Sequence, residues 1–179
     1  MMKEFIENFA KQFEYEPAIE NKENWYKAKK FLLCGMGGSH LQGDILQMLN
    51  PTLDFLVYSD YGLPENIGKG RLIIASSYSG NTEETISAFK EAQAQGFPLV
   101  VSSVGGKLIE LAKEHNVPYV QIPDTGIQPR SALGYTLKAL LKLTGEEDLL
   151  VEIKKLAQSF SSAMFEQEGK ELAQKLSLK

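Results

Sequence analysis

Short apolar runs alternate with segments of helical periodicity along this chain. The apolar runs lack a regular polar alternation, which is typical of strands that are buried on both faces. We predict such strands for residues 31–34, 53–58, 72–76, 98–102 and 118–122. We predict helices for residues 39–49, 82–95, 107–114, 131–143 and 146–165. Buried strands separated by helices predict an α/β domain, in which a parallel sheet carries helices on both faces.

The N-terminal part of the chain is predicted to consist of packing elements without catalytic or binding residues. Phe5, Ile6, Phe9 and Phe13 recur at roughly helical spacing and predict a first helix. A second, shorter helix is predicted for residues 22–30. We therefore expect an N-terminal helical segment, a main domain and a linker-like C-terminal helix, at residues 1–30, 31–165 and 166–179.

The stretch RLIIASSYSGNTEE, residues 71–84, joins an apolar run to a hydroxyl-rich loop and a helix start. The first turn of a helix has unpaired N–H groups and a partial positive charge, so it stabilises an anion. Ser77, Ser79 and Thr82 add hydroxyl donors. Gly80 lets the backbone approach an anion closely and adopt dihedrals that are forbidden to other residues. This combination predicts a phosphate-binding loop.

The helix after this loop is predicted to start with a capping pair, because Glu84 follows Asn81 by three positions. In a parallel sheet, ligands bind at the carboxyl ends of the strands, and the loops after residues 34, 76 and 122 all leave the predicted sheet at that edge. A solvated turn uses the same residue types as a phosphate loop. Both interpretations are therefore open for this loop taken alone.

A glycine-rich turn, GMGGSH, follows the first predicted strand in the manner of a dinucleotide-binding fingerprint. The match fails at the third glycine, because counting from Gly35 and Gly37 places His40 where close helix packing requires no side chain. No GxxxxGK(S/T) motif occurs, which excludes an NTPase P-loop. Gly37, Gly38 and Ser39 remain candidates for a second anion-binding helix start. The open alternative is a tight turn that needs glycine only for its geometry.

Composition limits the classes of partner. Hydrophobic residues make up 43% of the chain, enough for a buried core, and the formal charge is −4 without a dense basic cluster, so nucleic acid is not expected. Cys34 is the single cysteine, which excludes a disulfide framework and fits a reducing cytosol. No segment reads as a signal peptide or a membrane span. We expect a cytoplasmic protein without a metal or cofactor.

Three motifs occur in the order GMGGS, SxSGNTEET and QPRSALGY. At this spacing they resemble the sugar isomerase (SIS) domain, and more narrowly the N-terminal half of the bifunctional phosphoglucose/phosphomannose isomerases. The resemblance runs from about residue 20 to the end of the chain. It implies a flavodoxin-like SIS domain, with a five-stranded parallel sheet and a hexose 6-phosphate at the strand ends.

The resemblance also assigns roles, with the hydroxyl-rich loop gripping the phosphate and the GMGGS turn lining the sugar. The candidate substrate-binding residues are Gly37, Gly38, Ser39, Ser77, Ser79, Gly80, Asn81 and Thr82. Arg130 is the candidate catalytic residue, beside the sugar carbons. A fixed guanidinium there would stabilise the enediolate that forms when a proton moves between C1 and C2.

The position of Arg130 also indicates a nearby anion, independently of the resemblance. A cation at the first turn of a helix opposes the helix dipole, which costs about 0.3–1 kcal/mol unless an anion is nearby. An exposed arginine after Pro129, or an ion pair with Asp124, is the alternative interpretation.

Full-length members of the family have two SIS domains, and the general base glutamate and a ring-opening histidine belong to the second. We therefore expect this chain to be a half: a single domain, a truncated product or one component of a split enzyme. Glu84 is expected to cap a helix and Glu83 to face solvent. His40 and His115 are expected at helix ends, and a contact of His40 with the sugar, beside Ser39, is the alternative interpretation. Isomerase activity of the chain alone is expected to be weak or absent.

Three classes of function remain open. The first is an isomerase domain that interconverts glucose 6-phosphate or mannose 6-phosphate with fructose 6-phosphate. The others are a non-catalytic phosphosugar sensor and an oligomerisation module, for which Met164, Phe165 and residues 168–179 offer an apolar face. Because SIS sites are usually completed by another domain or subunit, we expect a homodimer or pairing with a second SIS domain.

Overall fold

Five parallel strands form one sheet in the order β2-β1-β3-β4-β5 in the computed structural model, which describes residues 2–177. The strands are β1 (Lys30–Cys34), β2 (Asp54–Tyr58), β3 (Leu72–Ser76), β4 (Leu99–Ser103) and β5 (Tyr119–Gln121). This is the flavodoxin-like order, in which the strand order reverses beside β1. The predicted α/β fold with a five-stranded parallel sheet is confirmed.

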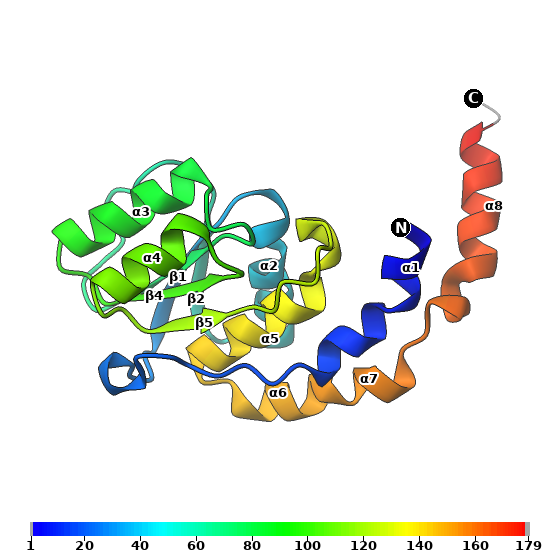
Figure 1. Cartoon of the computed structure of the whole chain (residues 1–179), viewed down its shortest axis with the longest axis horizontal. Helices are drawn as coiled ribbons and strands as arrows, with labels where there is room; N and C mark the ends of the chain where they lie inside the picture. Colours follow the sequence, from blue (N-terminus) through cyan, green and yellow to red (C-terminus); the bar gives the residue numbers. More distant parts are fainter. Residues whose placement is uncertain (1, 178–179) are drawn as a thin grey trace.

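Helices cover both faces of this sheet. The α-helices are α1 (Met2–Glu7), α2 (Leu41–Leu49), α3 (Glu83–Ala94), α4 (Gly106–Glu114), α5 (Leu133–Thr144), α6 (Glu147–Lys154), α7 (Leu156–Ser159) and α8 (Glu166–Ser177). The short 3-10 helices are η1 (Phe9–Glu14), η2 (Lys22–Asn24), η3 (Gly37–Ser39), η4 (Pro129–Ser131) and η5 (Ser162–Phe165). Helices α3 and α4 lie on one face, whereas α2, α5 and α6 lie on the other (Figure 1).

Alternate residues of each strand fill two apolar clusters, one on each face of the sheet. In β3, Leu72 and Ile74 pack toward α2 and α5, whereas Ile73 and Ala75 pack toward α3 and α4. All four residues are at most 2% exposed. Burial on both faces removes the whole apolar run from water, which is the main favourable term in forming such a strand.

The register of the central strands brings three loops to one edge of the sheet. Cys34 at the end of β1 pairs with Ala75 of β3, and Ser76 of β3 pairs with Ser102 of β4. Since all strands are parallel, the loops that follow β1, β3 and β5 leave from the same side.

The helix predicted for residues 22–30 is wrong. Only the three residues of η2 are helical, because Asn21 adopts a left-handed φ of 53° and Trp25 is extended. The segment is instead drawn toward the end of α5, where the Trp25 Nε1–H donates to the Leu143 carbonyl at 3.1 Å and Lys27 Nζ donates to the Gly145 carbonyl at 2.9 Å. Tertiary hydrogen bonds have overridden a weak local propensity.

The C-terminal region is helical as predicted but interrupted. Phe160 is extended between α7 and η5, and its ring packs edge-on against Phe9 with centroids 5.5 Å apart. This contact ties the C-terminal region to the N-terminal one. Helix α8 has no buried residue within its described length, and it projects from the body beside the N-terminal end of the chain (Figure 1).

Arg71 links the N-terminal ends of β1, β2 and β3. The residue is 8% exposed, and its Nη1 donates to the Phe31 carbonyl at 2.8 Å and pairs with Asp54 Oδ1 at 2.8 Å. Its Nε donates to the Ile67 carbonyl at 3.1 Å. A guanidinium suits this place because its rigid fork reaches several acceptors at once.

Replacing Arg71 by Met is expected to lower the free energy of unfolding by about 3 kcal/mol, because it leaves buried carbonyls without a donor. Urea denaturation of the wild type and the variant measures this loss. Arg71→Lys keeps the charge but lacks the fork, so its loss is expected to be intermediate. A stability of Arg71→Met equal to that of the wild type would contradict the assignment.

Lys138 in α5 gives a second, pH-dependent test. The residue is 1% exposed, its Nζ donates to the Phe13 carbonyl at 2.8 Å, and burial lowers its pKa. Between the lowered pKa in the folded chain and the ordinary lysine pKa of about 10.4, the unfolded chain holds this proton more strongly than the folded chain does. The free energy of unfolding therefore rises with pH in this range. The stability of the wild type minus that of Lys138→Met should be larger at about pH 10 than at about pH 8.5 in urea titrations. A difference that is flat or falls with pH would reject this view of Lys138.

Candidate functional site

Three loops meet at the carboxyl edge of the sheet, and contacts between them are specific. The Ser39 Oγ, in the turn after β1, accepts a hydrogen bond from the Tyr78 N–H, in the loop after β3, at 3.2 Å. A methyl group placed on Gly38 would lie 3.1 Å from the backbone nitrogen of Arg130, in the loop after β5. Residues from the three sequence motifs therefore come together, and the missing side chain of Gly38 leaves room for the Arg130 backbone.

Hydroxyl groups cluster in the loop between β3 and α3. The Ser77 Oγ lies 2.7 Å from the Thr82 Oγ1 and 3.5 Å from the Ser79 Oγ. Backbone N–H groups already bond to two of these hydroxyls, since Gly80 donates to the Ser77 Oγ at 3.1 Å and Asn81 donates to the Ser79 Oγ at 3.3 Å. Ser77 is 2% exposed and Ser79 is exposed, so the cluster runs from the protein interior to solvent.

Gly80 has the unusual backbone conformation that was predicted for it, and a close contact adds a second requirement that was not predicted. It has a left-handed φ of 73°, and a methyl group there would collide with the carbonyl oxygen of Gly105. The loop after β4 thus closes directly onto Gly80, and any larger residue would push the two loops apart.

The predicted capping pair of Asn81 and Glu84 is wrong. The residue that precedes α3 is Thr82, which makes no side-chain capping hydrogen bond. The Asn81 Oδ1 instead accepts from the Lys107 N–H at 3.0 Å, in the first turn of α4. Asn81 therefore links the starts of two neighbouring helices, and the first turn of α3 lies open toward the hydroxyl cluster.

Arg130 lies in η4, just before α5, and its side chain is exposed. It forms no ion pair with any carboxylate of residues 2–177. Asp124, the predicted alternative partner, instead accepts from the Gly126 N–H at 3.1 Å. The guanidinium is thus placed at the strand-end edge with its donors uncommitted to a side-chain anion.

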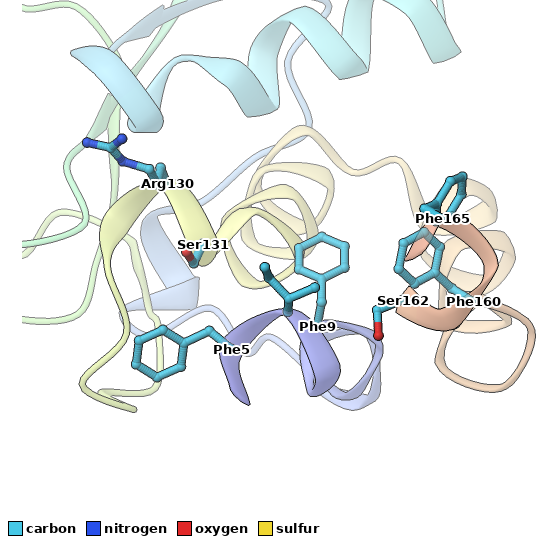
Figure 2. Close-up of a pocket in the computed structure, with 8 residues that line it drawn as sticks. Phe5, Phe9, Arg130, Ser131, Phe160, Ser162 and Phe165 are labelled. Atoms are coloured by element: carbon cyan, nitrogen blue, oxygen red, sulfur yellow. The ribbon is translucent and has the colours of Figure 1, made fainter. Parts of the chain in front are cut away.

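A pocket of about 260 Å³ lies beside η4, and four of its eight lining residues are phenylalanines (Figure 2). Its lining residues are Phe5, Ile6, Phe9, Arg130, Ser131, Phe160, Ser162 and Phe165. Figure 2 shows the Arg130 guanidinium directed away from the phenylalanine rings. The pocket therefore presents mainly apolar surface, and the charge of Arg130 points away from it.

Gln12 supports the Arg130 loop and was not among the predicted residues. It is 4% exposed, its Nε2 donates to the Ser131 carbonyl at 2.6 Å, and its Oε1 accepts from the Gly134 N–H at 2.9 Å. These bonds satisfy the backbone of η4 and the open start of α5. No local motif signals this role, because Gln12 and its partners are more than a hundred residues apart in sequence.

Glu83 and His40, near the loops, have partners of their own, and Cys34 is buried. Glu83 accepts from the Tyr61 hydroxyl at 3.2 Å, His40 Nε2 lies 3.4 Å from Asp44 Oδ2, and burial raises the pKa of the Cys34 thiol to about 12. Residues 2–177 contain no group of three His, Cys, Asp or Glu side chains placed to hold a metal ion. Within the same residues, no helix combines the length and apolar character needed to cross a bilayer.

Two sequence relatives are bifunctional phosphoglucose/phosphomannose isomerases. The protein of Aquifex aeolicus is 37% identical over 178 residues, which cover 96% of this chain and 53% of the relative. The protein of Caldicellulosiruptor bescii is 42% identical over 117 residues, which cover 64% of this chain and 34% of the relative. The chain thus spans between one third and about half of the length of these relatives. A comparison with protein-family models gave no match.

Two solved structures share the fold at low sequence identity. A ligand-bound protein of Escherichia coli CFT073 superposes with a TM-score of 0.61 at 18% identity, over 88% of this chain and 92% of that one. The sugar isomerase domain of an RpiR transcription factor from Sphaerobacter thermophilus superposes with a TM-score of 0.54 at 17% identity, over 89% and 96%. The chain is thus similar in sequence to the bifunctional phosphoglucose/phosphomannose isomerases, as the motifs predict, and it shares its fold with a sugar isomerase domain of known structure.

Proposed function

We propose that this chain is the phosphosugar-binding SIS domain of an aldose–ketose isomerase that interconverts glucose 6-phosphate or mannose 6-phosphate with fructose 6-phosphate. The observation that carries the proposal is the meeting of the hydroxyl cluster, the Ser39 turn and Arg130 at one sheet edge. The names of the two sequence relatives support the substrate class.

The phosphate would bind at the first turn of α3. Ser77, Ser79 and Thr82 would donate their hydroxyls, and the open N–H groups of the helix start would complete a set of neutral donors. Each hydroxyl can rotate, so an incoming phosphate would replace the present contact between Ser77 and Thr82 without moving the backbone. Gly80 and Asn81 would hold the loop against α4, through contacts with Gly105 and Lys107.

The sugar would then extend from the phosphate toward the GMGGS turn. Gly37, Gly38 and Ser39 would line it, and Arg130 would lie beside its carbonyl carbons. Proton transfer between C1 and C2 passes through an enediolate whose negative charge exceeds that of the ground-state carbonyl. A guanidinium held at that position by the bound sugar phosphate would stabilise the enediolate more than the substrate, which is the requirement for catalysis.

The reaction also needs a general base, and the loops supply none in an evident position. Glu83 is bonded to Tyr61, and Glu84 lies in the first turn of α3. We therefore propose that the chain binds phosphosugars more effectively than it isomerises them. In a coupled assay for fructose 6-phosphate isomerisation, purified residues 1–179 are expected to be weakly active or inactive.

The exposed apolar residues near the C-terminal end favour a second role in assembly. Met164 is 66% exposed, Phe165 is 52% exposed and Leu172 is 58% exposed. Homodimer formation, or pairing with a second SIS domain, would cover such a surface. Binding of phosphosugar without turnover would instead favour sensing as the role of the site.

Hexose 6-phosphates are expected to raise the melting temperature of the chain in proportion to the logarithm of their concentration over their Kd. A thermal-shift titration with fructose, glucose and mannose 6-phosphates measures this, beside inorganic phosphate and unphosphorylated glucose. Glucose is expected to have no effect, because it lacks the anion that the hydroxyl cluster binds. Equal shifts by glucose and glucose 6-phosphate would overturn the proposed site.

Replacing Ser79 by Ala is expected to weaken fructose 6-phosphate binding about tenfold, because it removes one hydrogen bond to a charged group. Ser159→Ala serves as the matched control, since Ser159 is also exposed but lies in α7, outside the three loops. Isothermal titration calorimetry measures both affinities. A similar affinity of the two variants would remove Ser79 from the site.

Replacing Arg130 by Met is expected to affect an enediolate mimic more than the substrate. 5-Phosphoarabinonate carries a carboxylate where the enediolate charge develops, so its affinity should fall at least tenfold more than that of fructose 6-phosphate. Arg130→Lys should restore part of the difference because it keeps the charge. Parallel losses for both ligands would show that Arg130 has no special relation to the reacting carbons.

A further inference from the structure

Gln42 lies completely buried in α2, directly beneath two of the loops that form the candidate site, with an exposure of 0%. Its Nε2 donates to the Ser39 carbonyl at 2.8 Å and to the Ser76 Oγ at 2.7 Å. One side-chain amide thus contacts the turn after β1 and the end of β3 at the same time. Because it is buried, Gln42 cannot itself touch a ligand.

Both contacts of Gln42 lead to residues of the proposed site. Ser39 accepts from the Tyr78 N–H through its own hydroxyl, and Ser76 directly precedes Ser77 of the hydroxyl cluster. The backbone is tight here, since a methyl group on Gly35 would lie 2.9 Å from the Ser39 carbonyl oxygen and 3.0 Å from that of Ser76. The amide of Gln42 thus bonds from below to both of the segments that lead into the two loops.

A glutamine at position 42 is energetically unfavourable if its only role is packing. Its Oε1 is buried and has no hydrogen-bond partner among the described residues, and the same is true of the Ser102 Oγ. Ser102 pairs in register with Ser76, so both unpartnered oxygens lie in the layer beneath the strand ends. A buried polar atom without a partner costs free energy that an apolar side chain of similar volume would avoid. The two hydrogen bonds that Gln42 donates are thus the specific contribution of this residue.

We propose that Gln42 is a positioning residue that sets the spacing between the phosphate-binding loop and the sugar-binding turn. This inference rests on the proposed function. Inorganic phosphate would contact only the hydroxyl cluster, whereas a hexose 6-phosphate must reach the cluster and the turn at once. Loss of the link should therefore penalise the sugar phosphate selectively, because two subsites that move independently bind a rigidly connected ligand less well.

The test compares Gln42→Met with Thr144→Val by calorimetric titration. Methionine keeps the volume of Gln42 but donates no hydrogen bond. Thr144 is the matched control, because it is also 0% exposed and bonds through its Oγ1 to the carbonyls of Leu140 and Leu141, away from the loops. In Gln42→Met, the affinity for fructose 6-phosphate is expected to fall about tenfold and that for phosphate less than about threefold. In Thr144→Val, both affinities should stay unchanged whatever the loss of melting temperature.

Hydrogen exchange of the unliganded chain gives a readout that does not depend on ligand binding. Gln42→Met should speed the exchange of amides in residues 35–40 and 77–80 together, whereas Thr144→Val should leave them unchanged. If Gln42→Met does not fold, Ser76→Ala removes one of the two bonds and should give the same pattern in smaller measure.

The outcomes separate this inference from the proposed function. If the wild type binds no phosphosugar, the proposed function fails, and faster exchange in both loops of Gln42→Met still supports the structural link. Equal losses of affinity for fructose 6-phosphate and phosphate would overturn the inference while leaving the site intact. Unchanged exchange in the two loops would overturn it as well.

Discussion

Burial of both faces of a parallel sheet is the constraint on which the candidate site depends. Apolar strands that need cover on two sides are joined by helices that cross over the sheet, and every crossover returns the chain to the same edge. Loops that are far apart in sequence therefore start side by side. The Ser39 to Tyr78 hydrogen bond and the close approach of Gly38 to Arg130 follow from this arrangement.

The strands could be predicted because their signal is local. An apolar run such as that of β3 has one stable place, between two helical layers, and its pattern alone indicates that place. The helix predicted at residues 22–30 failed because its outcome is decided elsewhere, by the carbonyls of Leu143 and Gly145 at the end of α5. Asn81 failed as a cap for a similar reason, since α4 offered its side chain a partner on another helix.

The same difference between local signals and long-range contacts applies to the candidate site. Glycines in tight turns and hydroxyls before a helix are local requirements, so the motifs that contain them could be recognised from the sequence. The supporting residues could not, because their roles exist only in three dimensions. Gln12 bonds to Ser131 across 119 positions, and Gln42 bonds to Ser76 across 34 positions. Glutamine is common on helix surfaces, and nothing in its neighbours along the chain marks it as buried.

The burial of Cys34 has a practical consequence for studies in solution. The chain contains one cysteine, and burial in the centre of the sheet keeps its thiol protonated and out of reach of alkylating reagents. A cysteine introduced at an exposed position of α8 would then be the only nucleophilic sulfur available to a maleimide. Fluorescent or spin probes can thus be attached at a chosen place without first removing the native sulfur atom.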